Sequence, residues 1–252
     1  MGTRKGVMPR KIKSIKMNSE KAGTAYGIRV GYASAAAEEI SGDAAISCGL
    51  PDGSLALILS DGMGKGIKAA AGSNLVVRRL RRNLKNGMSA ATAIKEVNRY
   101  MINAKENSEE FATVDLTLID KNNLKARFYK MGAAKSFIVR NGKVREIKGG
   151  CLPIGMISGL RLSHVSAKLL AGDIIIMVSD GITEADKEDI QAVWLRDFLC
   201  QKAASYTQNM DISGFSTRRA AACILEEALT HYDKKERDDL TAVVAVIAEK
   251  EM

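Results

Sequence analysis

Residues 55–62 read Leu-Ala-Leu-Ile-Leu-Ser-Asp-Gly, and residues 174–181 read Ile-Ile-Ile-Met-Val-Ser-Asp-Gly. Each segment is a run of aliphatic residues, typical of a strand buried on both faces, that continues directly into Ser-Asp-Gly. Each strand therefore delivers one carboxylate, Asp61 or Asp180, to its end. A charge beside a buried strand is costly unless it is paired or binds a cation. Either Asp-Gly pair alone would be typical of an ordinary turn.

Two further acidic sites fit the same pattern. Asp43 follows Ser-Gly at the start of a predicted strand, and Asp238 and Asp239 precede the last apolar strand. If these strands are neighbours, their carboxylate oxygens meet at one edge and form a hard, all-oxygen site suited to Mg²⁺ or Mn²⁺. Spacing along the sequence does not establish that the strands are neighbours.

The rest of the chain alternates short apolar strands with amphipathic helices. Pro51-Asp52-Gly53 predicts a hairpin turn, Asn86-Gly87 ends the first helix, and Ser89 is a candidate N-cap for the second. The predicted strands cover 25–35, 43–50, 54–60, 112–119, 124–130, 136–139, 143–147, 165–169, 174–178 and 241–248. The predicted helices cover 65–84, 89–103, 193–205 and 216–231. This grouping predicts an α+β fold with two central antiparallel sheets and helices outside them.

The composition favours one large globular domain. With 252 residues and 46% hydrophobic content, the chain can bury a substantial core. Aliphatic runs such as Ile174–Val178 are far short of the roughly 20 residues that a membrane helix needs. The four cysteines include no Cys-x-x-Cys pair, so neither a disulfide scaffold nor a zinc site is indicated. No arginine stands six positions after any of them, which excludes a cysteine-phosphatase loop.

The net charge of +9 is concentrated near the N-terminus. Residues 1–30 contain eight basic side chains against Glu20 alone, whereas the rest of the chain is nearly neutral. Tyr26 is the only aromatic residue in this segment, so a nucleic-acid partner is not indicated. We expect residues 1–24 to form a basic arm or linker remnant, and residues 25–252 to form the folded domain.

The glycine-rich run at residues 61–68 allows a competing interpretation as a nucleotide-binding loop. It does not match G-x-x-x-x-G-K-[S/T], and the acidic residue expected about twenty positions later is replaced by the basic cluster Arg78–Arg82. A dinucleotide-binding fold is therefore the weaker alternative. The basic cluster itself is predicted to be a solvated helix face.

Five motifs, in this order, give the chain a resemblance to the metal-dependent PPM phosphatases, and more narrowly to the bacterial stage II sporulation protein E subfamily. The motifs are Ser41-Gly-Asp43, Ser60-Asp-Gly-Met-Gly-Lys-Gly66, Leu152-Pro-Ile-Gly155, Ser179-Asp-Gly-Ile182 and Asp238-Asp-Leu-Thr241. The similarity covers residues 25 to 248. It implies a four-layer α-β-β-α sandwich with two Mn²⁺ or Mg²⁺ ions between the sheets, and a PPM-type phosphatase domain at 25–252.

The resemblance also implies a role for each acidic residue. Asp61 would bridge both ions, and Gly62 would bind the second ion through its main-chain carbonyl, together with Asp43. Asp180 and one member of the Asp238-Asp239 pair would hold the first ion. The resemblance does not decide which member of the pair is the ligand. Asp61 and Asp180 are the implied catalytic residues. The ions would activate a water that attacks phosphorus, so no protein nucleophile is needed.

The same resemblance implies the biological setting. The substrate would be a phosphorylated anti-sigma-factor antagonist protein, dephosphorylated on serine in the cytoplasm. The chain would be the cytosolic fragment of a membrane-anchored protein, with a homodimer as a further expectation, and Arg29 is a candidate for holding the substrate phosphate. The alternative is a pseudophosphatase, a binding module of the same fold. Retention of all four acidic sites argues against it.

Overall fold

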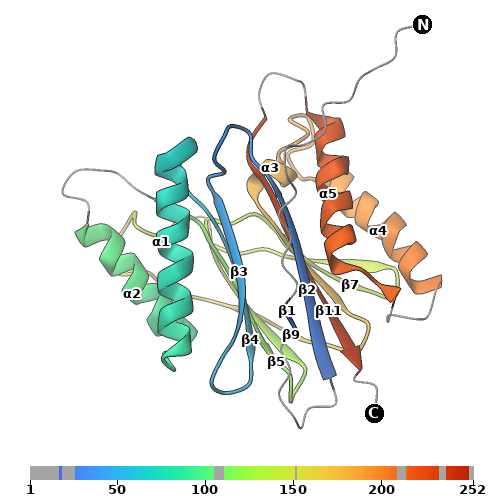
Figure 1. Ribbon diagram of the computed structural model, residues 1–252, viewed down its shortest axis with the longest axis horizontal. Helices are drawn as coiled ribbons and strands as arrows, with labels where there is room; N and C mark the ends of the chain where they lie inside the picture. The colour runs from blue at the N-terminus through green and yellow to red at the C-terminus, as the bar shows by residue number, and fades with distance from the viewer. Residues whose placement is uncertain are drawn as a thin grey trace, which may run out of the picture.

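Two antiparallel sheets lie face to face at the centre of the molecule, with helices on their outer faces (Figure 1). The computed structural model describes residues 17–18, 26–104, 111–150, 152–208, 214–232 and 237–249. Sheet I has the order β1 (Met17–Asn18), β2 (Tyr26–Ala35), β11 (Leu240–Glu249), β10 (Ile174–Val178), β7 (Ser136–Arg140) and β8 (Lys143–Ile147). Sheet II has the order β3 (Asp43–Gly49), β4 (Leu55–Asp61), β5 (Val114–Asp120), β6 (Lys125–Met131) and β9 (Val165–Lys168).

The helices form the two outer layers. Helices α1 (Gly66–Lys85) and α2 (Ala90–Asn103) cover sheet II, and α4 (Val193–Gln208) and α5 (Thr217–His231) cover sheet I (Figure 1). The short helix α3 (Asp180–Thr183) lies where strand β10 ends. The predicted α+β fold, a four-layer sandwich with two central antiparallel sheets, is confirmed.

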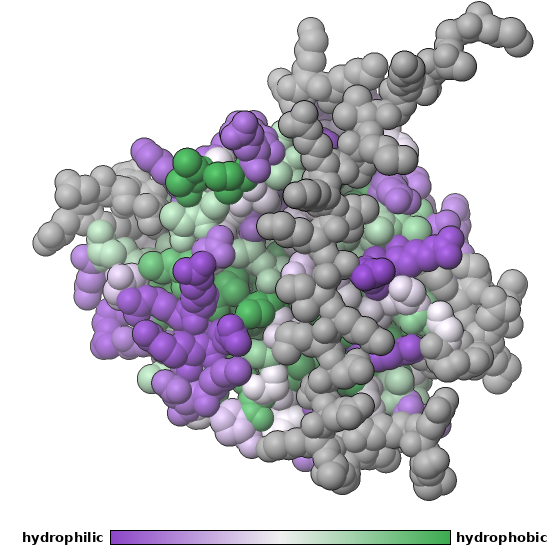
Figure 2. Space-filling model, in the orientation of Figure 1, coloured by the Kyte–Doolittle hydropathy of each residue, from purple (hydrophilic) through white to green (hydrophobic). Residues whose placement is uncertain are grey.

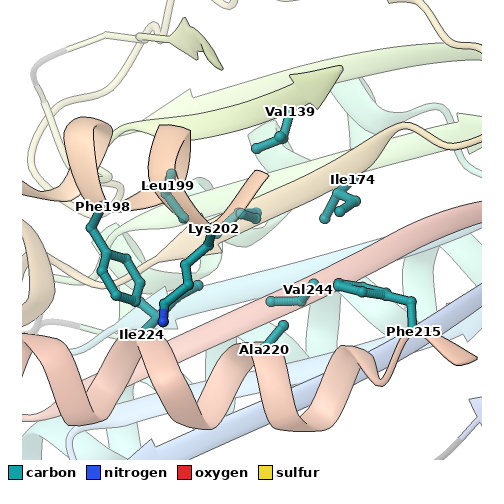
Figure 3. Close-up of a pocket in the computed structure, with 10 residues that line it drawn as sticks. Val139, Ile174, Phe198, Leu199, Lys202, Phe215, Ala220, Ile224 and Val244 are labelled. Carbon is teal, nitrogen blue, oxygen red and sulfur yellow. The ribbon is translucent and has the colours of Figure 1, made fainter. Parts of the chain in front are cut away.

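Strand β4 shows why its aliphatic run has no polar alternation. Ala56 and Ile58 pack against the apolar side chains of α1 and α2, whereas Leu57 and Leu59 pack against sheet I. Both faces of β4 are buried, so the residues that point to either face must be apolar. A third apolar layer joins sheet I to α4 and α5. Figure 3 shows a small cavity of about 20 Å³ in that layer, lined by Ile174, Val244 and other apolar side chains.

The turn and cap signals in the sequence are confirmed. Leu50 N–H donates to the Ser54 carbonyl at 2.8 Å and closes the β3–β4 hairpin. Gly87 follows the end of α1 with φ +82°, a left-handed conformation that favours glycine. Ser89 caps α2, because its side chain accepts a hydrogen bond from the Thr92 N–H.

Two expectations need comment. The nucleotide-binding alternative is wrong, because β4 pairs antiparallel with both β3 and β5, whereas that fold requires a mostly parallel sheet. The predicted basic arm lies outside the described residues except for Met17 and Asn18, which pair with β2. Among the helices described, none combines the length and apolar character that crossing a membrane requires.

Candidate metal centre

Four aspartates lie at one edge of the sandwich, which we call the carboxylate edge. Asp43, the first residue of β3, is the cross-strand partner of Asp61, the last residue of β4. Asp180 follows the end of β10 as the first residue of α3, and Asp238 precedes the start of β11. Because β10 and β11 are antiparallel neighbours, the end of one lies beside the start of the other. The structure thus brings together acidic sites that are far apart in the sequence.

The first Ser-Asp-Gly segment is held by sheet II and by α1. Ser60 Oγ donates to the Thr113 carbonyl at 2.7 Å, and the Asp61 N–H donates to Thr113 Oγ1 at 2.8 Å. A Cβ atom at Gly62 would lie 1.9 Å from the Ala69 carbonyl oxygen of α1. Glycine is required at residue 62, because only its absent side chain lets the α1 backbone come this close.

The second Ser-Asp-Gly segment is held by the residues that lead into β11. Ser179 Oγ accepts a hydrogen bond from the Thr241 N–H at 2.9 Å and donates to the Asp239 carbonyl at 3.3 Å. A Cβ atom at Gly181 would lie 2.2 Å from that same carbonyl oxygen. The Tyr232 hydroxyl, at the end of α5, donates to the Gly181 carbonyl at 2.5 Å.

The carboxyl groups of the edge strongly influence each other's ionisation. Burial, and then repulsion from Asp180 and Asp43, raises the pKa of Asp61 to about 9. Burial raises the pKa of Asp43 to about 7, against the opposing effect of the Thr241 and Ser179 hydroxyls. Burial and the nearby Asp238 also raise the pKa of Asp180. Such shifts indicate a cluster of acids whose mutual repulsion a bound cation would relieve.

Asp43 and Asp239 show contrasting hydrogen bonding. Both carboxylate oxygens of Asp43 are buried and accept no hydrogen bond within normal geometry in the described part of the chain, although the Thr241 and Ser179 hydroxyls lie near enough to lower its pKa. Asp239 instead accepts hydrogen bonds from the Ala37 N–H at 2.7 Å and the Gly42 N–H at 2.6 Å, one on each oxygen. Asp43 therefore has both oxygens available for a ligand, whereas Asp239 ties the start of β11 to the loop before β3.

The donor set fits a hard divalent cation. Carboxylate oxygens dominate the edge, and the buried oxygens of Asp43 have no partner, a costly arrangement unless a cation satisfies them. In the described ranges, no three or more histidine, cysteine, aspartate or glutamate side chains already stand in a metal-coordinating arrangement. The mutual repulsion that raises the pKa values opposes closer approach of these carboxylates.

Two further residues lie beside the edge and were not predicted from the sequence. Glu184 follows α3 and its pKa is raised by burial and by Asp180 and Asp238. Burial and Asp238 raise the pKa of Tyr232 to about 12. Only the fold brings Tyr232 to residues so distant in the chain, while the position of Glu184 one helical turn after Asp180 was a usable hint.

The remaining candidates lie elsewhere. Arg29 lies well along β2 from Ala35, the residue of that strand at the carboxylate edge, so its predicted contact with substrate phosphate is wrong for this arrangement. His164 stacks near Tyr129, with ring centroids 5.1 Å apart. His231 lies 4.4 Å from the Trp194 ring, centroid to centroid. Neither histidine belongs to the acidic motifs.

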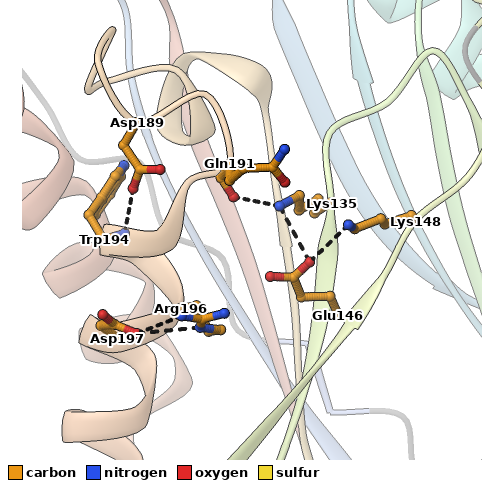
Figure 4. A network of polar contacts seen from close by, with 8 residues as sticks. All are labelled: Lys135, Glu146, Lys148, Asp189, Gln191, Trp194, Arg196 and Asp197. Atoms are coloured by element: carbon orange, nitrogen blue, oxygen red, sulfur yellow. Dashed lines mark hydrogen bonds and ion pairs between the residues drawn. The ribbon is translucent and has the colours of Figure 1, made fainter.

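A polar network positions the segment between α3 and α4 (Figure 4). Lys135 Nζ donates to the Gln191 carbonyl at 2.5 Å and lies 3.3 Å from a carboxylate oxygen of Glu146 on β8. The Asp189 carboxylate accepts from the Trp194 N–H at 2.7 Å and thereby caps the first turn of α4. The chain that leaves the carboxylate edge after α3 is thus attached to sheet I.

The fold and the carboxylate edge define the class of a PP2C phosphatase domain. The PP2C phosphatase domain of the cell fate determinant SpoIIE from Bacillus subtilis, solved with a fragment of its regulatory domain, is 28% identical with a TM-score of 0.77, over 96% of this chain and 72% of that one. The catalytic domain of the serine/threonine protein phosphatase PstP, solved with two manganese ions, shares the fold at 15% identity and a TM-score of 0.65, over 89% of this chain and all of that one.

The family follows from sequence comparison. The stage II sporulation protein E family matches residues 51–247. Stage II sporulation protein E of Priestia megaterium is 32% identical over 224 residues, which cover 88% of this chain. The chain therefore belongs to the stage II sporulation protein E family, and it spans 36% of the length of that relative.

Proposed function

We propose that this chain is a metal-dependent serine/threonine protein phosphatase that hydrolyses phosphoserine on a regulatory protein. The observation that supports it most is the pair of buried, unpartnered oxygens of Asp43 beside three further aspartates at one edge of a PP2C fold. An acidic pocket of this kind repels a phosphate group unless cations neutralise it. Membership of the family points to the same activity.

The residues expected to hold two divalent cations, Mn²⁺ or Mg²⁺, follow from their contacts. Asp61 is near acids of both sheets, since Asp180, Asp43 and Asp238 all raise its pKa, and this suits a ligand shared by both ions. Asp43 and the Gly62 carbonyl would complete one site, and Asp180 and Asp238 the other. Asp239 would act on the site indirectly, since backbone amides occupy both of its oxygens.

The bound cations would lower the pKa of a water molecule and offset charge on the phosphoryl oxygens. The chain's own part is to fix the positions of the carboxyl groups. Ser60, Thr113 and Ser179 hold the two Ser-Asp-Gly backbones through the hydrogen bonds described above. Asp180 also shares a hydrogen bond with the Asp61 carboxyl, which lowers the pKa of Asp180 and raises that of Asp61. Protons held by these carboxyl groups would have to be released for cations to bind.

The surface around the carboxylate edge suits a folded protein substrate. Met63, Ile67 and Ile40 are 59%, 73% and 44% exposed, and they lie within a few residues of Gly62 or Gly42. Figure 2 shows an apolar patch at the upper end of α1 and a hydrophilic surface over its lower part, where Arg78 is exposed. An exposed apolar rim next to a catalytic centre is typical of a protein-binding surface. We propose a phosphorylated anti-sigma-factor antagonist in the cytoplasm as the substrate, and a homodimer as the active assembly.

The activity is tested by hydrolysis of para-nitrophenyl phosphate and of a phosphoserine protein, with Mn²⁺ or with EDTA. Wild type is expected to turn over only with metal, and Asp61→Asn to lose this activity. Asp197→Asn, on the exposed surface of α4, is the matched control and should behave as wild type. Equal activity of wild type and Asp61→Asn, or no activity with any metal, would support a binding module of the same fold instead.

A further inference from the structure

A buried polar cluster lies between the two sheets, and the proposed mechanism does not use it. It consists of Asp115 of β5, Lys130 of β6 and Ser136 of β7, and we call it the inter-sheet triad. Lys130 Nζ donates to Asp115 Oδ2 at 2.5 Å and to Ser136 Oγ at 2.8 Å. Ser136 Oγ donates to Asp115 Oδ2 at 2.6 Å. The side chains of Lys130 and Asp115 are each only 1% exposed.

The strand register places the triad directly below the carboxylate edge. In sheet II, Asp115 pairs with Leu59, which precedes Asp61 by two residues on the same face of β4. In sheet I, Ser136 pairs with Met177, near the end of the strand that leads into the second Ser-Asp-Gly segment. The triad therefore joins the sheet that bears one half of the acidic site to the sheet that bears the other half.

Stability alone does not explain an ion pair at this level of the core. Its neighbours Leu59 and Met177 are apolar, and replacing a buried ion pair by apolar residues of similar volume is often neutral or stabilising. Burial lowers the pKa of Lys130, and only the adjacent Asp115 opposes that shift. What the triad adds over apolar contacts is direction, because hydrogen bonds fix distances and angles that apolar packing leaves less defined.

We propose that the inter-sheet triad sets the separation of the two sheets at the carboxylate edge and so acts as a positioning unit for cation binding. The inference rests on the proposed function, because the two halves of the acidic site need a fixed separation only if they share bound ions. Groups that hydrogen-bond directly to metal ligands are worth 10- to 100-fold in metal affinity or activity. The triad acts through the neighbouring strand positions Leu59 and Met177, so we expect the lower end of that range. Ser136 is the key member, since it is the only one of the three in sheet I.

The principal test is Ser136→Ala, which removes the link to sheet I and leaves the Lys130–Asp115 ion pair in place. Titration calorimetry with Mn²⁺ is expected to show about tenfold weaker binding than wild type. The Mn²⁺ concentration for half-maximal phosphatase activity should rise by the same factor, while kcat at saturating Mn²⁺ stays near the wild-type value. Loss of a residue that only stabilised the fold would not raise the Mn²⁺ requirement while leaving kcat unchanged.

Two further variants keep the test decisive. Arg140→Ala breaks the ion pair between the last residue of β7 and the buried Asp173, at the end of the strand away from the carboxylate edge. It should lower the melting temperature and leave Mn²⁺ affinity unchanged. The double variant Asp115→Leu, Lys130→Met removes the charges together, so it should remain folded and still bind Mn²⁺ about tenfold more weakly.

The outcomes separate the two proposals. Wild-type Mn²⁺ affinity in both Ser136→Ala and the double variant would overturn the role of the triad and leave the proposed phosphatase standing. Weaker binding in Arg140→Ala as well would also overturn it, because loss of stability would then suffice. Absence of Mn²⁺ binding by wild type would overturn the proposed function, and the inference with it.

Discussion

A buried serine lies at the end of both β4 and β10: Ser60 is the last residue but one of β4, and Ser179 directly follows β10. The Ser60 hydroxyl donates to the Thr113 carbonyl, and the Ser179 hydroxyl donates to the Asp239 carbonyl. After the aspartate the two regions differ. The first continues through an exposed glycine-rich loop into the 20 residues of α1, which has no side-chain N-cap. The second turns at once into the four residues of α3, which the Tyr232 hydroxyl secures.

The difference shows that the same Ser-Asp-Gly tripeptide is supported by different elements at its two positions. Gly62 is covered by the backbone of α1, whereas Gly181 is covered by the backbone that leads into β11, the strand between β2 and β10 in sheet I. The geometry at Asp61 therefore depends on where a surface helix sits, and the geometry at Asp180 depends on a central strand. The second half of the site should be the more rigid half.

The largest expected effect comes from comparing Asp61→Asn with Asp180→Asn. Asp61 interacts with acids of both sheets, so Asp61→Asn should abolish binding of both ions. Asp180→Asn should leave one Mn²⁺ bound. Both variants should lose at least about 100-fold in turnover, more than loss of an outer partner costs. Calorimetric stoichiometry measures the difference. Equal stoichiometry in the two variants would contradict the shared position of Asp61.

Alanine at the two glycines should destabilise both regions, and the first more. The new Cβ would meet the Ala69 carbonyl oxygen at 1.9 Å in Gly62→Ala and the Asp239 carbonyl oxygen at 2.2 Å in Gly181→Ala. Overpacking of this kind costs about 1–3 kcal/mol or more. Thermal unfolding measures it, with Gly214→Ala as the control, because no atom lies within 4 Å of the Cβ there. Control-like stability of Gly62→Ala would show that α1 moves aside easily.

The metal-free protein should lose stability as pH rises. Its Asp43 and Asp61 titrate at about 7 and about 9, whereas both have an ordinary pKa of 3.8. Between pH 4 and these values the folded state holds protons that the unfolded state has released, so the free energy of unfolding falls with rising pH and levels off above about 9. Melting curves in EDTA from pH 5 to 9 test this. Asp43→Asn should flatten the dependence of melting temperature on pH near pH 7. An unchanged slope in this variant would contradict the raised pKa of Asp43.

The smallest effect should distinguish the neighbours Asp238 and Asp239. Asp239→Asn puts an amide NH₂ against one of two backbone donors and should lower the free energy of unfolding by about 1–3 kcal/mol. Asp238→Asn should barely change stability, since that residue is exposed, yet it should weaken Mn²⁺ binding. Denaturant unfolding and calorimetry on both variants give the comparison. The reverse pattern would exchange the two roles.

The sequence was sufficient to predict the layers and to pick out the aspartates that the structure brings to one edge. Strict aliphatic runs, turn residues and caps are local signals, so β8 and β10 have the predicted bounds and Ser89 caps α2. The roles of Asp239 and Tyr232 were not predictable, because each depends on a partner in a distant segment. The inter-sheet triad was missed for the same reason. Its polar residues occupy strand positions where alternation predicts exposure, and only the second sheet buries them.

The bond from Asp239 to Gly42 joins residues 197 positions apart, and β11 inserts between β2 and β10. During synthesis on the ribosome, residues that precede β11 emerge first, and sheet I then lacks a central strand. Folding that waits for such distant pairing is slow. A nascent chain should therefore be inactive until β11 has left the exit tunnel. This would prevent premature dephosphorylation by incomplete chains.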